Sequence, residues 1–264
     1  MLPRVEREKM YQIDVNSDLG ESFGRYTLGM DEKIIPLVSS ANVACGFHAS
    51  DPIVMWRTIE QMKKAGGQIG AHPGFPDLMG FGRRNMQISF EEAKAYTLYQ
   101  LSALAGMCKA QGMQLQHVKP HGAMYNMAGK DYQLSKAICE AVQEFDPSII
   151  ILGLSGSETI RAAEDCGLRV AREVFADRGY EEDGSLVNRA KEGAFIHDEE
   201  EAIERVIGII KEQTVKAVTG KAIPIQADSV CVHGDGEKAL LFVEKMIASF
   251  EKEDIKVVPL KKMV

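Results

Sequence analysis

Short apolar runs alternate with longer amphipathic runs along most of the chain. The apolar runs have the length and composition of buried strands, and they occupy residues 11–20, 42–47, 68–74, 115–122, 148–156, 169–177, 227–235 and 255–260. Segments with helical spacing follow the first seven runs, at residues 31–41, 51–67, 89–112, 131–145 and 157–167, after His197, and at residues 236–254. The pattern therefore predicts a strand–helix unit that repeats along the chain.

Two of the expected helices have clear start signals. Asp51 precedes Pro52 as an N-cap would, and proline is favoured in the first helical turn. Ser89 and Glu92 are three residues apart, which is the spacing of a capping box. These signals place helix starts directly after the second and third strands of the series.

Seven strand–helix units and a last strand, with no linker between them, favour a parallel sheet covered by helices. The regular repetition favours a closed or nearly closed (β/α) barrel over an open doubly wound sheet, since no G-x-G-x-x-G opens the first helix. A chain of this length often forms one such barrel. We expect residues 10–264 to form a single barrel domain and residues 1–9 to be a flexible tail.

Composition narrows the class of ligand and the compartment. The 264 residues include 31 Lys and Arg against 38 Asp and Glu, so the formal charge of −7 argues against nucleic acid and favours a small molecule. The 5 cysteines lack C-x-x-C spacing, which indicates free thiols in a reducing cytoplasm. The N-terminus lacks an apolar signal region and the longest apolar run is far too short to span a bilayer, so no membrane association is expected.

Polar residues recur where the expected strands end. The stretch "NVACGFHASDP" reads as a buried strand and ends on His48. Other side chains of this kind at strand ends are Asn16, Asp18, Glu21, His72, Lys119, His121, Asp177, Arg178, His233 and Asp235. Because the carboxyl ends of parallel strands share one rim, where ligands bind in α/β folds, we expect these groups to line a common pocket.

Each of these residues also has an ordinary structural interpretation. A single histidine at a strand end is more often a ring that bonds a neighbouring backbone group than a catalyst. Four of the 6 histidines on one rim make a functional site the better interpretation, whereas His117 falls within a strand and His197 begins a helix. Asp14 alternates with Asn16 and Asp18, and Asp18 is the better candidate because it is nearer the strand end.

Five stretches taken together resemble the LamB/YcsF family: "DVNSDLGESFG", "NVACGFHASDP", "GAHPGFPDLMGFGRR", "VKPHGAMYN" and "FADRGYEEDGSLVNR". The similarity covers about residues 10–260. It implies a seven-stranded parallel (β/α) barrel of the glycoside hydrolase/deacetylase type. It also implies the role of the A subunit in a prokaryotic 5-oxoprolinase, which opens 5-oxoproline to glutamate with ATP and with partner subunits B and C.

That reaction would need general acids and bases, and cations for the substrate's carboxylate and for phosphate. The expected catalytic residues are Asp18, His48, His72, His121 and Asp177. The expected substrate-binding residues are Asn16, Glu21, Lys119, Arg178 and His233. No G-x-x-x-x-G-K-[ST] occurs, so we expect the ATP-dependent activation to depend on the partner subunits.

Two alternatives stay open from the sequence. Asp18, His48 and His72 could together bind a divalent metal, as in related deacetylase-like barrels, which would favour a metal-dependent hydrolase. The chain could also be a non-catalytic subunit that only binds a small acid for its partners. A pure binder of a small acid needs cations and amides more than several histidines and carboxylates, so we favour the enzyme.

Overall fold

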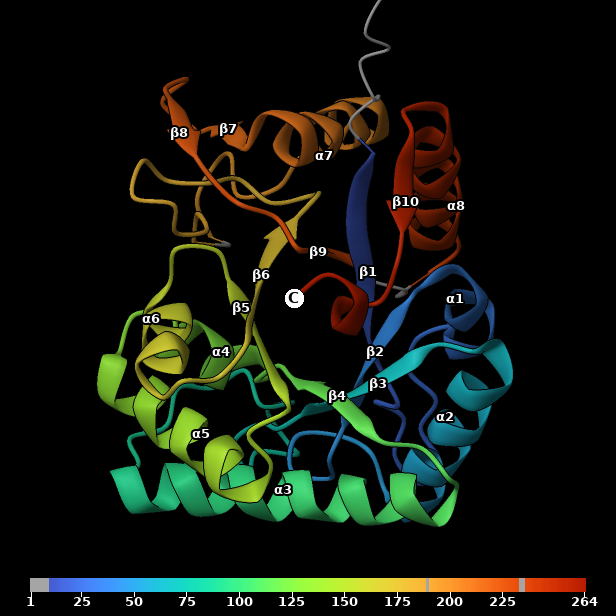
Figure 1. Cartoon of the computed structure of the whole chain (residues 1–264), viewed down its shortest axis with the longest axis vertical. Helices are drawn as coiled ribbons and strands as arrows, with labels where there is room; N and C mark the ends of the chain where they lie inside the picture. Colours follow the sequence, from blue (N-terminus) through green and yellow to red (C-terminus); the bar gives the residue numbers. More distant parts are fainter. Residues whose placement is uncertain (1–9, 189, 233–235) are drawn as a thin grey trace, which may run out of the picture.

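The computed structural model describes residues 10–188, 190–232 and 236–264. Within them, seven parallel strands close into a barrel in the order β1, β2, β3, β4, β5, β6, β9 and back to β1 (Figure 1). The bounds of these strands are Tyr11–Leu19, Ser40–Ala44, Gln68–His72, Leu115–Val118, Ile150–Leu154, Val170–Phe175 and Ser229–Val232. The seven-stranded parallel barrel predicted from the sequence is confirmed.

Strand β1 is longer than its neighbours, and its two ends pair differently. Tyr11–Ile13 pair with the last strand, β10 (Ile255–Val257), which lies beside β1 outside the closed ring (Figure 1). The following residues of β1 pair with β9 and then with β2. The chain therefore closes its barrel between the first strand and the seventh, and β10 extends the sheet at the amino-terminal end of β1.

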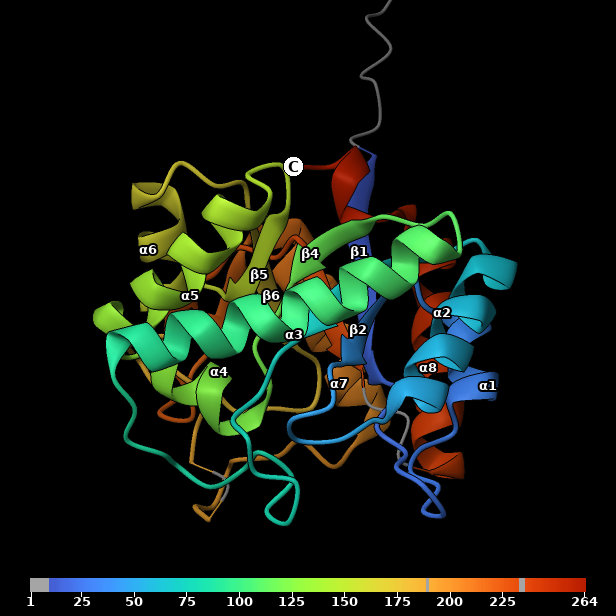
Figure 2. The same cartoon turned by 90° about the horizontal axis from the view of Figure 1, so that it is seen from below.

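Helices cover the outside of the barrel. They are α1 (Asp31–Ile34), α2 (Pro52–Ala65), α3 (Phe90–Ala110), α4 (Gly122–Ala128), α5 (Tyr132–Phe145), α6 (Glu158–Asp165), α7 (Glu199–Glu212) and α8 (Glu237–Lys252), with short 3₁₀ turns at Ile35–Leu37 and Leu260–Lys262. Figure 2 shows α3 lying across the outside of the barrel beside α2 and α5. Within the described residues, none of the helices combines the length and apolar character needed to cross a membrane.

The predicted helix starts are confirmed in detail. The Asp51 carboxylate accepts hydrogen bonds from the backbone N–H groups of Ile53 and Val54 and so caps α2. Ser89 and Glu92 form the capping box of α3. His197 is exposed directly before Asp198, which is the N-cap of α7.

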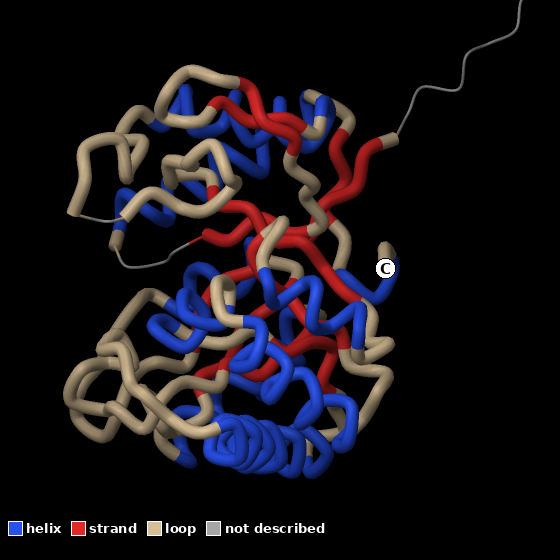
Figure 3. The backbone as a smooth tube through the Cα atoms, turned by 90° about the vertical axis from the view of Figure 1, so that its left-hand side faces the viewer, coloured by secondary structure: helices blue, strands red, loops and turns tan. Residues whose placement is uncertain are grey.

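Two elements have no counterpart in the elements expected from the sequence. Helix α4 follows β4 after a short connection, and the antiparallel hairpin of β7 (Thr214–Lys216) and β8 (Ala222–Pro224) follows α7. Seven residues in the helix and three in each strand are too few for a hydrophobic period to stand out. The loops that follow the barrel strands gather on one side of the molecule (left in Figure 3).

The interior of the barrel is polar along β1, and the outer face of this strand is apolar. Alternate residues of β1 face opposite sides, so Ile13 and Val15 pack in the main core under the helices while Asp14, Asn16 and Asp18 point inward. The Asp14 carboxylate accepts hydrogen bonds from Ser39, Ser40 and Ser229 at 2.7, 2.6 and 2.5 Å. Paired polar groups, rather than layers of aliphatic side chains, therefore fill this part of the barrel.

Asp14→Asn should change how the stability of the chain depends on pH. Burial raises the pKa of Asp14 from 3.8 to about 6, although its three hydroxyl donors oppose that shift. A carboxyl with a raised folded pKa holds its proton better in the folded chain, so stability falls as pH rises through this window. Urea unfolding should give a free-energy difference between wild type and variant that declines by about 2–3 kcal/mol from pH 4 to pH 7. A difference independent of pH would contradict the shift.

Candidate active site

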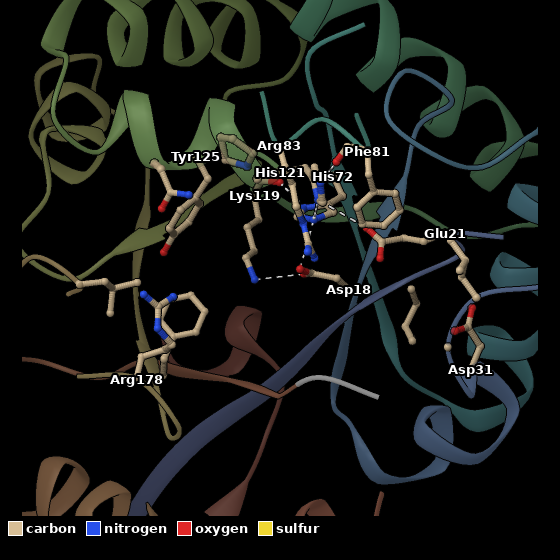
Figure 4. A pocket seen from close by; sticks show the side chains of 18 residues that line it. Asp18, Glu21, Asp31, His72, Phe81, Arg83, Lys119, His121, Tyr125 and Arg178 are labelled. Atoms are coloured by element: carbon tan, nitrogen blue, oxygen red, sulfur yellow. Dashed lines mark hydrogen bonds and ion pairs between the residues drawn. The ribbon is translucent and has the colours of Figure 1, made fainter. Parts of the chain in front are cut away.

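A cavity of about 460 Å³ opens at the carboxyl ends of the strands (Figure 4). Its lining includes the side chains of Asp18, Glu21, His72, Arg83, Lys119, His121, Tyr125 and Arg178. Six of these were predicted from their positions at strand ends in the first, third, fourth and sixth strand–helix units. The structure therefore brings together residues that are far apart in the chain, such as Asp18 and Lys119, which are separated by 101 positions.

A buried ammonium group forms the floor of the cavity. Lys119 Nζ lies 2.8 Å from Glu173 Oε1 and 3.1 Å from Asp18 Oδ1, and it donates to Asn16 Oδ1 at 3.2 Å. Burial alone would lower the pKa of Lys119, but the charges of Asp18 and Glu173 outweigh it and hold this pKa well above its ordinary value. Lys119 therefore stays charged throughout the physiological pH range.

Glu173 is the buried partner of this lysine, and it was missed in the sequence. Its carboxylate also accepts hydrogen bonds from Asn16 Nδ2 at 3.0 Å and from the Tyr125 hydroxyl at 2.7 Å. The available signal was a glutamate in the middle of the apolar strand "VAREVF", because such a residue must find a cation or donors when it is buried.

Hydrogen bonds to backbone carbonyls determine which ring nitrogen of His72 and of His121 carries hydrogen. His72 Nδ1 lies 2.7 Å from the carbonyl of Lys119, and His121 Nε2 lies 2.8 Å from the carbonyl of Phe81. A carbonyl only accepts, so both of these nitrogens carry hydrogen. Burial, and then the neighbouring His48 and His72, lower the pKa of His121 to about 2, so its Nδ1 is a bare lone pair.

The bare nitrogen of His121 meets other acceptors. His72 Nε2 is 3.0 Å from His121 Nδ1 and 3.3 Å from Asp18 Oδ2. Glu21 Oε1 lies 3.4 Å from the same nitrogen of His121. Several electron-rich atoms therefore converge on one point, where a bound cation would satisfy their lone pairs.

His48 lies behind this cluster, away from the described lining of the cavity. Its ring stacks on His121 with 3.6 Å between the ring centroids, and its Nε2 lies 3.1 Å from Glu21 Oε1. Burial and the nearby His72 lower the pKa of His48 well below its ordinary value, so the neutral ring donates to Glu21. His48 holds Glu21 and His121 in position, which explains why an apolar strand is followed by a histidine.

The donor set fits a divalent metal. Among the described side chains, Glu21, His48, His72 and His121 each offer a ligand atom within 4.8 Å of the others. Neutral imidazoles with a carboxylate are the ligands that zinc prefers, and carbonyl hydrogen bonds to the far nitrogens of His72 and His121 are the usual outer contacts of such ligands. Relative to the trio expected from the sequence, the cluster contains Glu21 and His121 and lacks Asp18.

The remaining predicted residues lie outside this cluster. Asn16 is buried below Lys119 and contacts its ammonium group. Arg178 lines the cavity, but its Nε and Nη2 donate to the carbonyls of Ala194 and Val187 within its own loop. Asp177 is outside the described lining and acts electrostatically on Arg205 of α7, so its catalytic role stays a prediction without a supporting contact. His233 lies outside the described residues.

Comparison with known proteins agrees with this architecture. The model of the LamB/YcsF family matches residues 13–264. The A subunit of the 5-oxoprolinase from Clostridium beijerinckii is 63% identical over 254 residues, which are 96% of this chain and 100% of that protein. The crystal structure of a lactam utilization protein from Thermus thermophilus matches with a TM-score of 0.90 at 41% identity, covering 94% of this chain and 99% of that chain.

A more distant match concerns the fold alone. A deacetylase solved with its substrate matches with a TM-score of 0.50 at 11% identity, covering 96% of this chain and 90% of that chain. The deacetylase-type barrel predicted from the sequence is thereby confirmed.

Lys119→Met should destabilise the chain by about 3–5 kcal/mol, because it leaves the buried Glu173 carboxylate without its cation. Adding Glu173→Gln should recover part of that loss, because the unpaired charge is then removed as well. Urea unfolding of the two single variants and the double variant measures both effects. A single Lys119→Met variant as stable as wild type would show that the ion pair does not hold the cavity floor.

Proposed function

Because this chain belongs to the LamB/YcsF family, we propose that it is the A subunit of a 5-oxoprolinase that opens 5-oxoproline to glutamate with ATP. The similarity to the Clostridium beijerinckii protein covers nearly the whole length of both chains. The observation that carries the proposal is the cavity, in which the charged Lys119, the carboxylates of Asp18 and Glu21 and two histidines converge. Opening a lactam needs groups of these kinds within reach of one small substrate.

The chemistry of the ring determines what the site must do. The lactam amide is resonance-stabilised, and transfer of phosphate from ATP to its oxygen makes the carbon electrophilic. Water then adds to that carbon, the C–N bond breaks, and the ring nitrogen takes up a proton and becomes the amino group of glutamate. A second water releases the phosphate from the side-chain carboxyl.

The residues of this chain fit these steps. The Lys119 ammonium faces the cavity with its charge retained, so it can stabilise negative charge that develops on the substrate oxygen. Asp18 lies between Lys119 and His72, within 3.1 and 3.3 Å, and can take the proton of the attacking water. The Asp18 carboxyl, once protonated, can return that proton to the ring nitrogen, and His72 holds this carboxyl in position at 3.3 Å.

ATP and the partner subunits belong to the assembled enzyme in this proposal. The sequence contains no P-loop, which supports activation of the substrate with the help of partner subunits B and C. We place the complex in the cytoplasm, because all 5 cysteines are free thiols, as is usual in a reducing compartment.

We also propose that Glu21, His72 and His121 bind a divalent metal, with His48 holding Glu21 and His121 in position from behind. The support for this site is the convergence of lone pairs around His121 Nδ1, which a cation would relieve. A bound zinc ion would supply Lewis acidity and lower the pKa of a water molecule at the cavity wall. A metal-dependent hydrolase of another amide is the second candidate function, and this donor set is what favours it.

The purified chain alone should not release glutamate from 5-oxoproline and ATP, whereas the chain combined with subunits B and C should do so. The expected difference follows from the missing nucleotide motif. Glutamate and inorganic phosphate are measured together, with the B and C subunits alone as the control. ATP-coupled glutamate release by the single chain would contradict the division of labour, and an inactive complex would contradict the proposed function.

Metal binding is measured directly on the chain, without reference to turnover. After chelation and dialysis, the wild-type protein should bind one equivalent of Zn²⁺ by calorimetry and give a d–d absorption spectrum with Co²⁺. His121→Asn should weaken Zn²⁺ binding by about 100-fold or more, because it removes a ligand rather than an outer contact.

His197→Asn is the matched control for that experiment, because His197 is exposed and outside the donor cluster. It should bind the metal as the wild type does. A wild-type chain that takes up no Zn²⁺ would contradict the proposed metal site.

A further inference from the structure

Two consecutive arginines at the mouth of the cavity have different environments. Arg84 makes a bidentate ion pair with the Asp77 carboxylate, which also accepts a hydrogen bond from the backbone N–H of Gly80. Arg83 lines the cavity instead, and none of the described carboxylates lies within ion-pair distance of it. Arg84 therefore holds the loop together, while the guanidinium group of Arg83 is directed toward the space that a ligand would occupy.

The loop presents Arg83 through an unusual backbone turn. Phe81 has a φ of 53° and Gly82 a φ of 60°, so a non-glycine residue is held in the left-handed region two positions before Arg83. Contacts on both sides keep the turn in place: the Phe81 carbonyl accepts from His121 Nε2 at 2.8 Å, and the Gly82 carbonyl accepts from the Ala123 backbone N–H at 2.9 Å. A strained turn with this support is typical of a functional position.

The side chain of Arg83 is oriented as well. Its guanidinium carbon lies 5.1 Å from the centre of the Phe81 ring, at a distance typical of a cation–π contact. The charge of Arg83 also contributes to the lowered pKa of His48, so this charge acts electrostatically on the histidine cluster. Figure 4 places Arg83 on the same side of the cavity as His121 and Phe81.

The other cations of the cavity already have partners. Lys119 is neutralised by Asp18 and Glu173, and Arg178 donates to carbonyls of its own loop. The cavity also contains the carboxylates of Glu21 and Asp31, which repel an anion. An anionic substrate therefore needs a further cation to enter, and Arg83 is placed to supply it.

We infer that Arg83 binds the carboxylate of the substrate and thereby selects lactams that carry an acidic group. This inference rests on the proposed function, because 5-oxoproline differs from the plain lactam 2-pyrrolidinone by its carboxylate. The guanidinium group can hold that carboxylate with two parallel hydrogen bonds. The lactam ring then extends from the mouth of the cavity toward Lys119 and the histidine cluster.

The test compares Arg83→Gln with wild type in the complex assembled with subunits B and C. KM for 5-oxoproline should rise by about 10- to 100-fold, the range expected for loss of a charge-assisted bidentate contact, while kcat changes by less than about 3-fold. The inhibition constant of 2-pyrrolidinone should stay the same, because this ligand has no carboxylate. Arg83→Lys should recover part of the lost affinity, since it restores the charge without the fork.

Arg84→Gln separates binding from loop integrity. It removes the ion pair that braces the loop, so any indirect effect should be at least as large in this variant as in Arg83→Gln. If our inference holds, any weakening of binding by Arg84→Gln should affect both 5-oxoproline and 2-pyrrolidinone. Arg83→Gln should weaken the binding of 5-oxoproline alone, because only this ligand carries a carboxylate. Equal weakening of both ligands by Arg83→Gln would overturn the inference.

Two further results would also overturn it. If Arg83→Gln left KM for 5-oxoproline unchanged but weakened inhibition by inorganic phosphate, the arginine would serve the phosphoryl group instead. If the variant behaved as wild type in an active complex, the inference alone would fail. An inactive wild-type complex is a different result, because it rejects the proposed function and removes the premise.

Discussion

The ion pair between the buried Lys119 ammonium and the buried Glu173 carboxylate is the interaction on which the site depends. Neither charge could be removed from water alone, and the pair is stable because Asn16, Asp18 and Tyr125 satisfy the remaining donors and acceptors. These residues come from several strands and from α4, so the pair ties the barrel together at its carboxyl end. The same arrangement leaves one face of the ammonium directed into the cavity.

A polar column continues from this pair through the interior of the barrel. Ser229 donates to Asp14 and accepts from Asn16, and Asn42 donates to both Asn16 and Asp18. Such a network is costly unless every member finds a partner, so each side chain has little freedom to move. The rigidity that a catalytic constellation requires therefore comes from the same hydrogen bonds that make a polar barrel interior possible.

Hydrogen bonds also fix the orientation of the histidine rings. Carbonyls of Lys119 and Phe81 hold protons on the outer nitrogens of His72 and His121, which leaves the inner nitrogens to face each other and the acids. His48 supports this arrangement from behind by stacking on His121 and bonding Glu21. The motif "NVACGFHASDP" thus contributes to the site through a residue that positions other residues.

Much of the fold and part of the candidate site could be predicted from the sequence alone. The hydrophobic periods were long enough to predict the order of strands and helices, and the caps at Asp51 and Ser89 located two helix starts. Parallel strands share one rim, so the positions of Asp18, His72, Lys119 and His121 at strand ends were enough to expect them near one another. The short helix α4 and the hairpin of β7 and β8 were not predicted, because a few residues do not establish a hydrophobic period.

The tertiary structure alone decided which of these polar groups are partners and which are available. Local sequence does not distinguish Arg83 from Arg84, because the difference lies in Asp77 and in a left-handed turn at Phe81. Likewise, the closed barrel brings Glu173 next to Lys119, which is far from it in the sequence. The folding of its own loop places carbonyls where Arg178 donates to them. Periodicity tells which face a residue occupies, but charges and hydrogen bonds act through space, so their pairing exists only once the barrel has closed.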